Sequence, residues 1–116
     1  MKKYLFISGM LASSVLLYNC SGSKKATASK PPPYTYESNV KTAIEAYCTP
    51  CHIPSKGGNK KSYDNFANVK SDIDEIIRRI EMNPGDRGYM PFKKPKLADS
   101  SIAVFKKWKE DGLGEK

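Results

Sequence analysis

The sequence predicts an all-helical domain that begins near Glu37 and continues to residue 116. Apolar residues recur every three or four positions in the segments 40–47, 73–80 and 102–108, which is the spacing of one helix face. No stretch alternates apolar and polar residues as a strand does, and loops rich in proline and glycine separate the periodic segments. With 116 residues, the chain has room for one small domain.

The first helix is expected to begin near residue 37 and to end at about Cys48. Ser38 or Asn39 can cap its start. Pro50 ends it, because proline lacks a backbone donor and disfavours the helical conformation at Thr49. The buried face is expected to consist of Val40, Ala43, Ile44 and Tyr47.

Two helices are expected in the middle of the domain, a short one over residues 63–69 and a longer one after it. Ser71, with Asp74 three positions later, has the pattern of a capping box at the start of the longer helix. Asn83-Pro84-Gly85 ends this helix. Its apolar stripe consists of Ile73, Ile76, Ile77 and Ile80.

The last helix follows a loop that runs to Leu97. Asp99 or Ser100 can cap its start, and Gly112 is expected to end it. Ile102, Phe105 and Trp108 lie on one face at helical spacing.

Residues 1–19 resemble a bacterial lipoprotein signal peptide. Lys2 and Lys3 form a basic start, and the apolar segment 4–18 is too short to cross a membrane comfortably as a helix. Leu17 lies three positions before Cys20, as is typical of cleavage just before a cysteine that then carries lipid. The alternatives are an uncleaved membrane anchor for the segment and a free thiol for Cys20.

Residues 20–36 are expected to form a flexible tether between this lipid-anchor cysteine and a domain that spans residues 37–116. The segment is rich in Ser, Lys, Ala and Pro, and it has too few apolar groups to bury. Pro31-Pro32-Pro33 stiffens one part of it in the extended polyproline conformation.

The charge of the chain restricts the classes of partner. The formal net charge of the whole chain is +8, and cleavage before Cys20 removes two lysines and no acidic residue, so the mature charge is +6. A positive balance favours acidic partners or anionic membrane surfaces. Nucleic acid is not an expected partner, because the export signal and the cysteine motif indicate other chemistry.

The sharpest signal is Cys48-Thr49-Pro50-Cys51-His52, which contains the only histidine of the chain. Cys-x-x-Cys-His is the signature of covalent attachment of c-type haem. Two thiols at this spacing can each add to one vinyl group of the same porphyrin, and the adjacent His52 can offer an imidazole nitrogen to the iron. The sequence therefore predicts one covalent haem on Cys48 and Cys51, with His52 as an axial ligand.

Three other uses of the cysteines were weighed. A structural zinc site needs four ligands, and the chain has no further thiol or histidine to pair with these three residues once Cys20 is set aside. A thioredoxin-like redox motif belongs in an α/β fold, whereas the surroundings here are helical. A disulfide between Cys48 and Cys51 would be strained.

The sixth position of the iron has two candidate ligands in the mature chain, Met90 and Met82. Met90 is the expected ligand, because it lies in a Gly-Tyr-Met-Pro loop whose backbone can be fixed, whereas Met82 lies off the isoleucine stripe. A thioether paired with histidine raises the reduction potential of haem and suits electron transfer. The alternatives are core packing for either methionine and a vacant or water-filled iron position.

Taken together, residues 38–113 resemble the monohaem class I cytochromes c, which are small helical domains wrapped around one covalent haem. The resemblance rests on the haem motif, Met90-Pro91, and Trp108-x-x-x-Gly112 in the closing helix. It implies that the first helix, with Val40, Ile44 and Tyr47, crosses the last helix at Phe105 and Trp108. It further implies a proline carbonyl, here that of Pro54, as the acceptor that orients His52.

The function expected from this resemblance is electron transfer in the cell envelope rather than enzymatic catalysis. The protein would be exported to the periplasm or envelope, held at a membrane by lipid on Cys20, and would carry single electrons between a redox donor and an acceptor. The alternatives are a haem-based sensor or peroxidase-like protein with an open sixth iron position, and a thiol oxidoreductase without haem.

Two further groups of residues were assigned to the expected haem site. Haem-pocket walls, or ordinary core, are expected from Tyr63, Phe66, Tyr89 and Phe92. A basic surface that steers an acidic partner, or a simple solvated face, is expected from Lys93, Lys94, Lys96, Lys106, Lys107 and Lys109.

Overall fold

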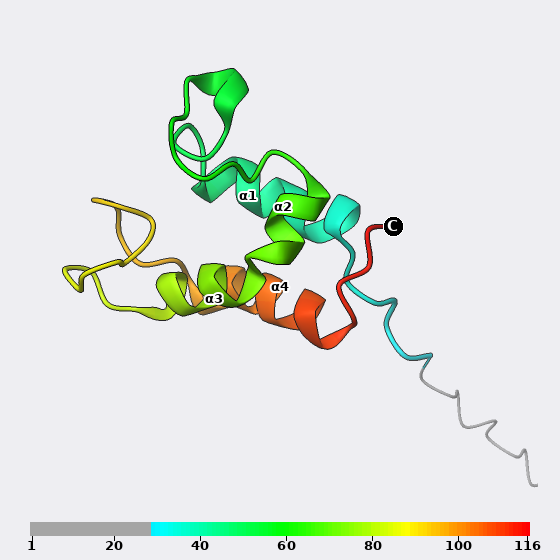
Figure 1. The fold of residues 1–116 in the computed structure, drawn as a ribbon. Helices are drawn as coiled ribbons and strands as arrows, with labels where there is room; N and C mark the ends of the chain where they lie inside the picture. Colours follow the sequence, from blue (N-terminus) through cyan, green and yellow to red (C-terminus); the bar gives the residue numbers. More distant parts are fainter. Residues whose placement is uncertain (1–28) are drawn as a thin grey trace, which may run out of the picture. The chain divides into compact units, whose positions relative to one another are not determined.

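The computed structural model describes residues 29–116, and the predicted signal peptide and Cys20 lie outside the described residues. The predicted all-helical class is confirmed for this part, in which the only β-type pairing is one isolated bridge. The elements are η1 (Tyr36–Val40), α1 (Lys41–Tyr47), η2 (Pro54–Lys56), α2 (Phe66–Ser71), α3 (Ile73–Glu81) and α4 (Asp99–Glu110) (Figure 1). In residues 29–116 no helix has the length and apolar character needed to span a bilayer.

The first helix begins within one residue of the predicted start, but with a different cap and a different first turn. It starts at Tyr36 with the π-helical turn η1, which α1 continues. Thr35 caps it, because its hydroxyl accepts from the Ser38 N–H at 3.2 Å while Asn39 Oδ1 accepts from the Thr35 N–H at 2.9 Å. These reciprocal bonds fix Thr35 as the capping residue in place of Ser38 or Asn39. The predicted end is confirmed, with Cys48 as the residue that follows α1.

The middle helices are present, but the expected capping box is not. Asn65 caps α2 by accepting from the Asn68 N–H at 2.9 Å. Asp72 occupies the position before α3, and the Ser71 hydroxyl donates to the Asn68 carbonyl instead of capping α3. The predicted apolar stripe is confirmed, since Ile73, Ile76 and Ile80 are buried and Ile77 is half-buried.

The last helix agrees with the prediction in its buried face and its end. Ile102, Phe105 and Trp108 are buried on α4. The helix begins at Asp99, without a capping side chain. Gly112 adopts a positive φ of 97°, and the Leu113 N–H returns to the Trp108 carbonyl at 3.0 Å, as is common after a helix C-terminus.

The first and last helical segments pack together in one hydrophobic core. α4 contacts both η1 and α3, and the core contains Val40 and Ile44 together with Phe105 and Trp108. Tyr47, the last residue of α1, was predicted to be buried but is exposed, and its hydroxyl lies 2.9 Å from Ser101 Oγ. At the far end of the core an aromatic group is formed by Tyr36, Phe66 and Trp108, with ring centroids 5.7–6.2 Å apart.

The two ends of the domain are joined in what we call the terminal clasp, residues 34–37 with residues 113–115. Gly114 O accepts from the Tyr36 N–H at 2.9 Å and from Trp108 Nε1 at 2.8 Å. Glu37 N–H donates to the Glu115 carbonyl at 3.0 Å. In Figure 1 the clasp lies at the opposite end of the domain from the loops that follow α1 and α3. Ordered contacts of the domain therefore begin at Tyr34 and not at residue 37.

Candidate functional site

The segment 48–52 forms a tight turn directly after α1. The His52 N–H donates to the Cys48 carbonyl at 3.0 Å, which brings both thiols and the imidazole to one place. Gly58 lies against this turn so closely that a Cβ there would be 2.3 Å from Pro50 O and 2.6 Å from Cys51 O. Only glycine lets the following loop close over the turn in this way.

The two thiols differ in their surroundings. Cys48 is half-buried, and this burial raises the pKa of its thiol to about 11, although Lys94 nearby opposes the shift. Cys51 is exposed, and both cysteines are free thiols. At neutral pH, Cys48 is therefore held as a neutral thiol.

His52 is held with one ring nitrogen available. Its Nδ1 lies 2.6 Å from the carbonyl of Lys61, and because a carbonyl only accepts, Nδ1 carries the proton. The other ring nitrogen, Nε2, has no hydrogen-bond partner among residues 29–116 and is the atom that can offer a lone pair. The expectation that Pro54 orients this histidine is wrong. Pro54 starts the short helix η2, and the loop beyond it returns to bring Lys61 to the ring.

Met90 is fixed by contacts of its loop with α3. The Met90 N–H donates to the Arg79 carbonyl at 3.2 Å, and Arg79 Nη1 donates to the Gly88 carbonyl at 3.2 Å. The buried Tyr89 donates its hydroxyl to the carbonyl of Lys94 at 3.1 Å. Met82, by contrast, has its sulfur 3.7 Å from Arg78 Nη1 on the outside of α3.

The residues of the turn and the Met90 loop line one cavity of about 650 Å³. Ligand sites in proteins commonly have this size and a mostly apolar lining. The site residues predicted from the sequence that line it are Cys48, Cys51, His52 and Met90. Its apolar lining includes Ile76, Ile80, Pro91, Leu97 and Phe105. Met82 does not line the cavity.

Charged side chains also line this cavity, and two of them are unpaired. Lys61 pairs with Asp72 at 2.5 Å, and Arg79 pairs with Glu75 at 2.5 Å. Lys60 and Lys94 line the same cavity and form no ion pair within the described part of the chain. The cavity therefore carries excess positive charge from two ammonium groups.

The aromatic residues assigned to this site divide into two pairs. Tyr63 and Phe92 line the cavity, and Phe92 is 67% exposed. Phe66 belongs to the aromatic group at the far end of the core, and Tyr89 is buried in its loop beside Met90. The prediction of cavity walls therefore holds for Tyr63 and Phe92. The alternative of ordinary packing holds for Phe66 and Tyr89.

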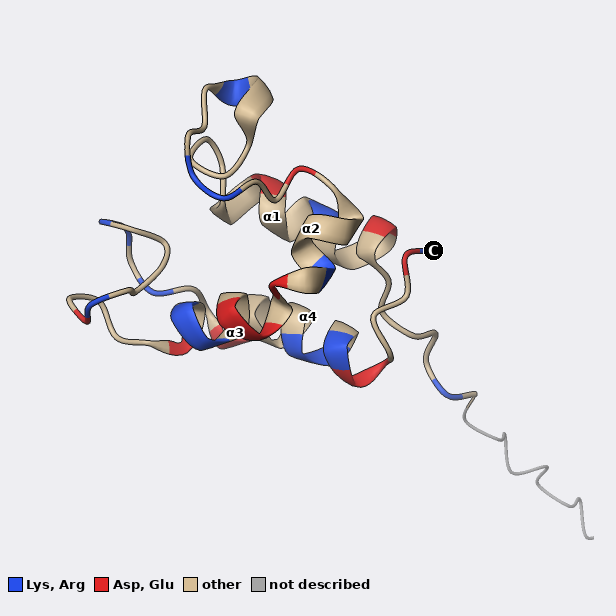
Figure 2. Ribbon diagram, in the orientation of Figure 1, with Lys and Arg blue, Asp and Glu red and all other residues tan. Residues whose placement is uncertain are grey.

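Most of the lysines assigned to a docking surface are already engaged. Lys106 pairs with Glu81 at 2.8 Å, Lys107 pairs with Asp111 at 2.8 Å, and Lys109 pairs with Asp74 at 2.6 Å. These pairs link basic positions of α4 to acidic ones. In Figure 2 both blue and red positions occur along α3 and α4.

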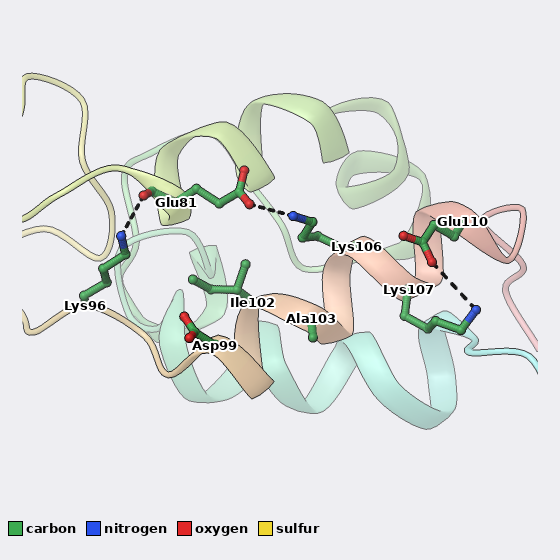
Figure 3. A pocket seen from close by; sticks show the side chains of 8 residues that line it. All are labelled: Glu81, Lys96, Asp99, Ile102, Ala103, Lys106, Lys107 and Glu110. Atoms are coloured by element: carbon green, nitrogen blue, oxygen red, sulfur yellow. Dashed lines mark hydrogen bonds and ion pairs between the residues drawn. The ribbon is translucent and has the colours of Figure 1, made fainter.

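The surface beside α4 forms a shallow hollow of about 450 Å³. Lys96 donates to the Glu81 carbonyl at 2.8 Å there, so this lysine too is engaged (Figure 3). Of the six predicted docking lysines, Lys93, Lys94 and Lys96 form no ion pair among residues 29–116, and of these three only Lys96 has a side-chain hydrogen bond there.

Three residues that shape the cavity were missed by sequence reasoning: Lys61, Asp72 and Arg79. Arg79 lies on α3, Asp72 lies just before it and Lys61 lies in the loop between η2 and α2, and a charged residue at any of these places is usually solvated. No local spacing distinguishes them, because their contacts join segments 9–11 residues apart through the loops.

Two observations bear on which group the cavity can hold. In residues 29–116 no group of three or more His, Cys, Asp and Glu side chains gathers as a metal-ion cage would require. The hydroxyl of Thr49, between the two cysteines, is buried and has no hydrogen-bond partner among these residues. The Thr49 hydroxyl is therefore a polar group of this turn that is left without a partner in the described part of the chain.

Comparisons with protein-family models, curated proteins and solved structures found no match to this chain. The function is therefore argued from the residues and their geometry.

Proposed function

We propose that this protein is a c-type cytochrome that carries one covalent haem and transfers single electrons. One observation supports the proposal above all others. The two thiols of the Cys-x-x-Cys-His motif, its histidine and the thioether of Met90 all line the same apolar cavity, although Met90 is 38 residues from His52 in sequence. The small class I cytochrome c domain is the architecture proposed with it.

The residues of the cavity fit haem in three respects. Cys48 and Cys51 are free thiols available for thioether bonds to two vinyl groups. His52 has an available Nε2, and Met90 offers a sulfur, which are the two ligand types of an electron-transfer haem. Lys60 and Lys94 supply the positive charge that the two carboxylates of haem require.

Haem would supply the one-electron couple, and the chain would supply its ligands and surroundings. His52 is oriented by Lys61, and the Met90 loop is held by Arg79, so both ligands are fixed before any electron arrives. Apolar side chains make up most of the cavity walls. Two protein ligands to the iron would favour electron transfer over the binding of a gas or peroxide.

The same proposal includes the location and the partners of the protein. The leading segment and Cys20 support export and lipid anchorage at a cell-envelope membrane. The mature charge of +6 supports acidic redox partners as donor and acceptor. Lys93, which lies over the exposed Phe92 ring at 5.3 Å, is the unpaired lysine best suited to touch such a partner.

Mass spectrometry of the mature protein tests this proposal. After expression with a haem-attachment pathway, we expect the peptide that contains residues 48–52 to carry the mass of one haem. A lipid on Cys20 is measured in the same experiment. A colourless protein with the mass of the bare peptide would exclude the cytochrome function.

The ligand role of Met90 is tested by Met90→Ala, with Met82→Ala as the matched control. Met90→Ala should lower the reduction potential and remove the absorption band of sulfur-ligated ferric haem, because the thioether is lost. Met82→Ala should change neither property, since Met82 lies outside the cavity. An unchanged spectrum in Met90→Ala would favour the alternative function, a sensor or peroxidase-like protein with an open sixth iron position.

A further inference from the structure

We propose that Tyr63 and Asp72 are positioning residues for His52, because they complete a closed ring of contacts that runs from His52 to Lys61, Asp72, Tyr63 and back to His52. This inference rests on the proposed function, in which His52 binds the haem iron. It goes beyond the ligand itself, because it concerns what fixes the plane of the imidazole.

The first arm of the ring runs through Lys61. Its carbonyl accepts from His52 Nδ1 at 2.6 Å, and its ammonium group pairs with Asp72 Oδ1 at 2.5 Å. Lys61 is thus held at both ends, by its backbone at the histidine and by its side chain at the carboxylate. The hydrogen bond alone leaves the imidazole free to tilt about the line from Nδ1 to the carbonyl oxygen.

The second arm of the ring of contacts runs through Tyr63 and prevents this tilt of the imidazole. The Tyr63 ring stacks on the His52 ring with centroids 4.5 Å apart and planes 10° apart. The backbone of Tyr63 is also tied to the same residue, since its N–H donates to the His52 carbonyl at 2.9 Å. The tyrosine is buried, and its hydroxyl donates a short hydrogen bond to Asp72 Oδ2.

Asp72 is the fixed residue to which both arms of the ring of contacts are bonded. Its N–H donates to the Val69 carbonyl at 3.2 Å, and its own carbonyl accepts from the Ile76 N–H at 2.9 Å, so it joins α2 to α3. Its side chain is only 14% exposed, and each carboxylate oxygen receives one of the two donors. This engagement also explains why the Asp72 side chain does not cap α3.

The ring of contacts fixes two properties of a metal-bound imidazole. The Nδ1–H bond sets the donor strength of the histidine, and the stacked ring sets the direction of its plane. Both depend on Asp72, although Asp72 does not touch the histidine. Loss of the Asp72 carboxylate should therefore change the electronic structure of an iron that is bound by His52.

Electron paramagnetic resonance of the ferric, haem-loaded full chain tests the inference. Tyr63→Leu removes the stacked ring and should shift or broaden the largest g value, and Asp72→Ala should do the same. Tyr63→Phe keeps the stacked ring but loses the bond to Asp72, so it should shift the g value less than Tyr63→Leu does. The reduction potential, measured by spectroelectrochemistry, should follow the same order.

Matched controls separate positioning from general damage to the fold. Tyr36→Leu removes another buried tyrosine, and Asp111→Asn alters another weakly exposed carboxylate, but neither residue lines the cavity. Both should leave the g values unchanged. If Tyr63→Leu yields too little protein, the isosteric Asp72→Asn carries the test with the same measurements.

The outcomes are distinguishable from failure of the proposed function. A haem-free wild type would overturn both proposals. A haem-loaded wild type whose g values survive Tyr63→Leu and Asp72→Ala would overturn only this one. Equal changes in Tyr63→Leu and Tyr36→Leu would also overturn it, because the effect would then not be specific to the ring of contacts.

Discussion

At the scale of single residues, Arg79 connects α3 to the Met90 loop in two ways. Its backbone carbonyl accepts from the Met90 N–H, and its guanidinium donates to the Gly88 carbonyl. Arg78, the preceding residue, also bonds to Glu75 but forms no hydrogen bond with the Met90 loop in the described part of the chain. Variants at Arg79 and Arg78 therefore distinguish the effect of fixing the Met90 loop from the effect of a surface ion pair.

Arg79→Ala should loosen the Met90 loop and lower the stability of the haem-loaded protein by about 1–2 kcal/mol, because a charged hydrogen-bond donor is lost. The absorption band of sulfur-ligated ferric haem should weaken. Arg78→Ala should have little effect on stability and leave the band intact, because exposed ion pairs contribute little. Thermal unfolding and visible spectra measure both effects, and equal spectra for the two variants would contradict the assigned role of Arg79.

The ligand residues of the candidate site could be named from the sequence because their chemistry is local. Two cysteines and a histidine at fixed spacing, and a methionine before a proline, are visible without any fold. The residues that orient them could not be named. Lys61 acts through its backbone carbonyl, which any residue possesses, so no side-chain pattern distinguishes it.

At the scale of elements, the terminal clasp joins the start of η1 to the chain beyond α4. Gly114 accepts two hydrogen bonds there, one from a backbone N–H and one from the indole of Trp108. Leu113 packs against the same core while being only half-buried. These contacts hold η1 against α4 without contributing any residue to the cavity.

Removal of residues 113–116 should therefore lower stability without abolishing haem attachment. Three hydrogen bonds at Gly114 and Glu115 are lost, which we expect to cost about 3 kcal/mol. For a domain of this size, the melting temperature should fall by on the order of 10–20 °C. Removal of Lys116 alone is the control and should have little effect. A truncated chain that melts like the full chain would show that the clasp does not stabilise the fold.

The helices could be predicted better than their ends. Burial of the isoleucine stripe in α3 and of Ile102, Phe105 and Trp108 in α4 follows directly from helical spacing. The caps were predicted less well, because capping side chains have other possible partners. The Asp72 carboxylate already accepts hydrogen bonds from Lys61 and Tyr63. The Asn39 side chain accepts from the N–H of Thr35, which is itself the cap.

At the scale of the whole molecule, the core and the cavity share their residues. Ile76, Ile80, Leu97 and Phe105 belong to the hydrophobic core and also line the cavity of about 650 Å³. A domain of this size buries too little apolar surface for comfortable stability on its own. A haem in the cavity would give these side chains the contacts that a larger core would provide.

The chain made without haem attachment should consequently show weak helicity by circular dichroism. The two thiols of the motif, Cys48 and Cys51, should react with iodoacetamide at similar rates, as expected of an unfolded chain, because the burial of Cys48 is lost. In the folded domain, burial raises the pKa of Cys48 to about 11, so this thiol would react far more slowly near pH 8 than the exposed Cys51. Strong protection of Cys48 in the haem-free chain would contradict the prediction.

The position of the terminal clasp determines how the domain would respond to mechanical force. A pull on the chain ahead of Tyr34 enters the domain at the hydrogen bonds of Gly114 and Glu115, at the opposite end from the turn 48–52 (Figure 1). We therefore expect tension in the preceding segment to break the clasp before it displaces the residues of the cavity.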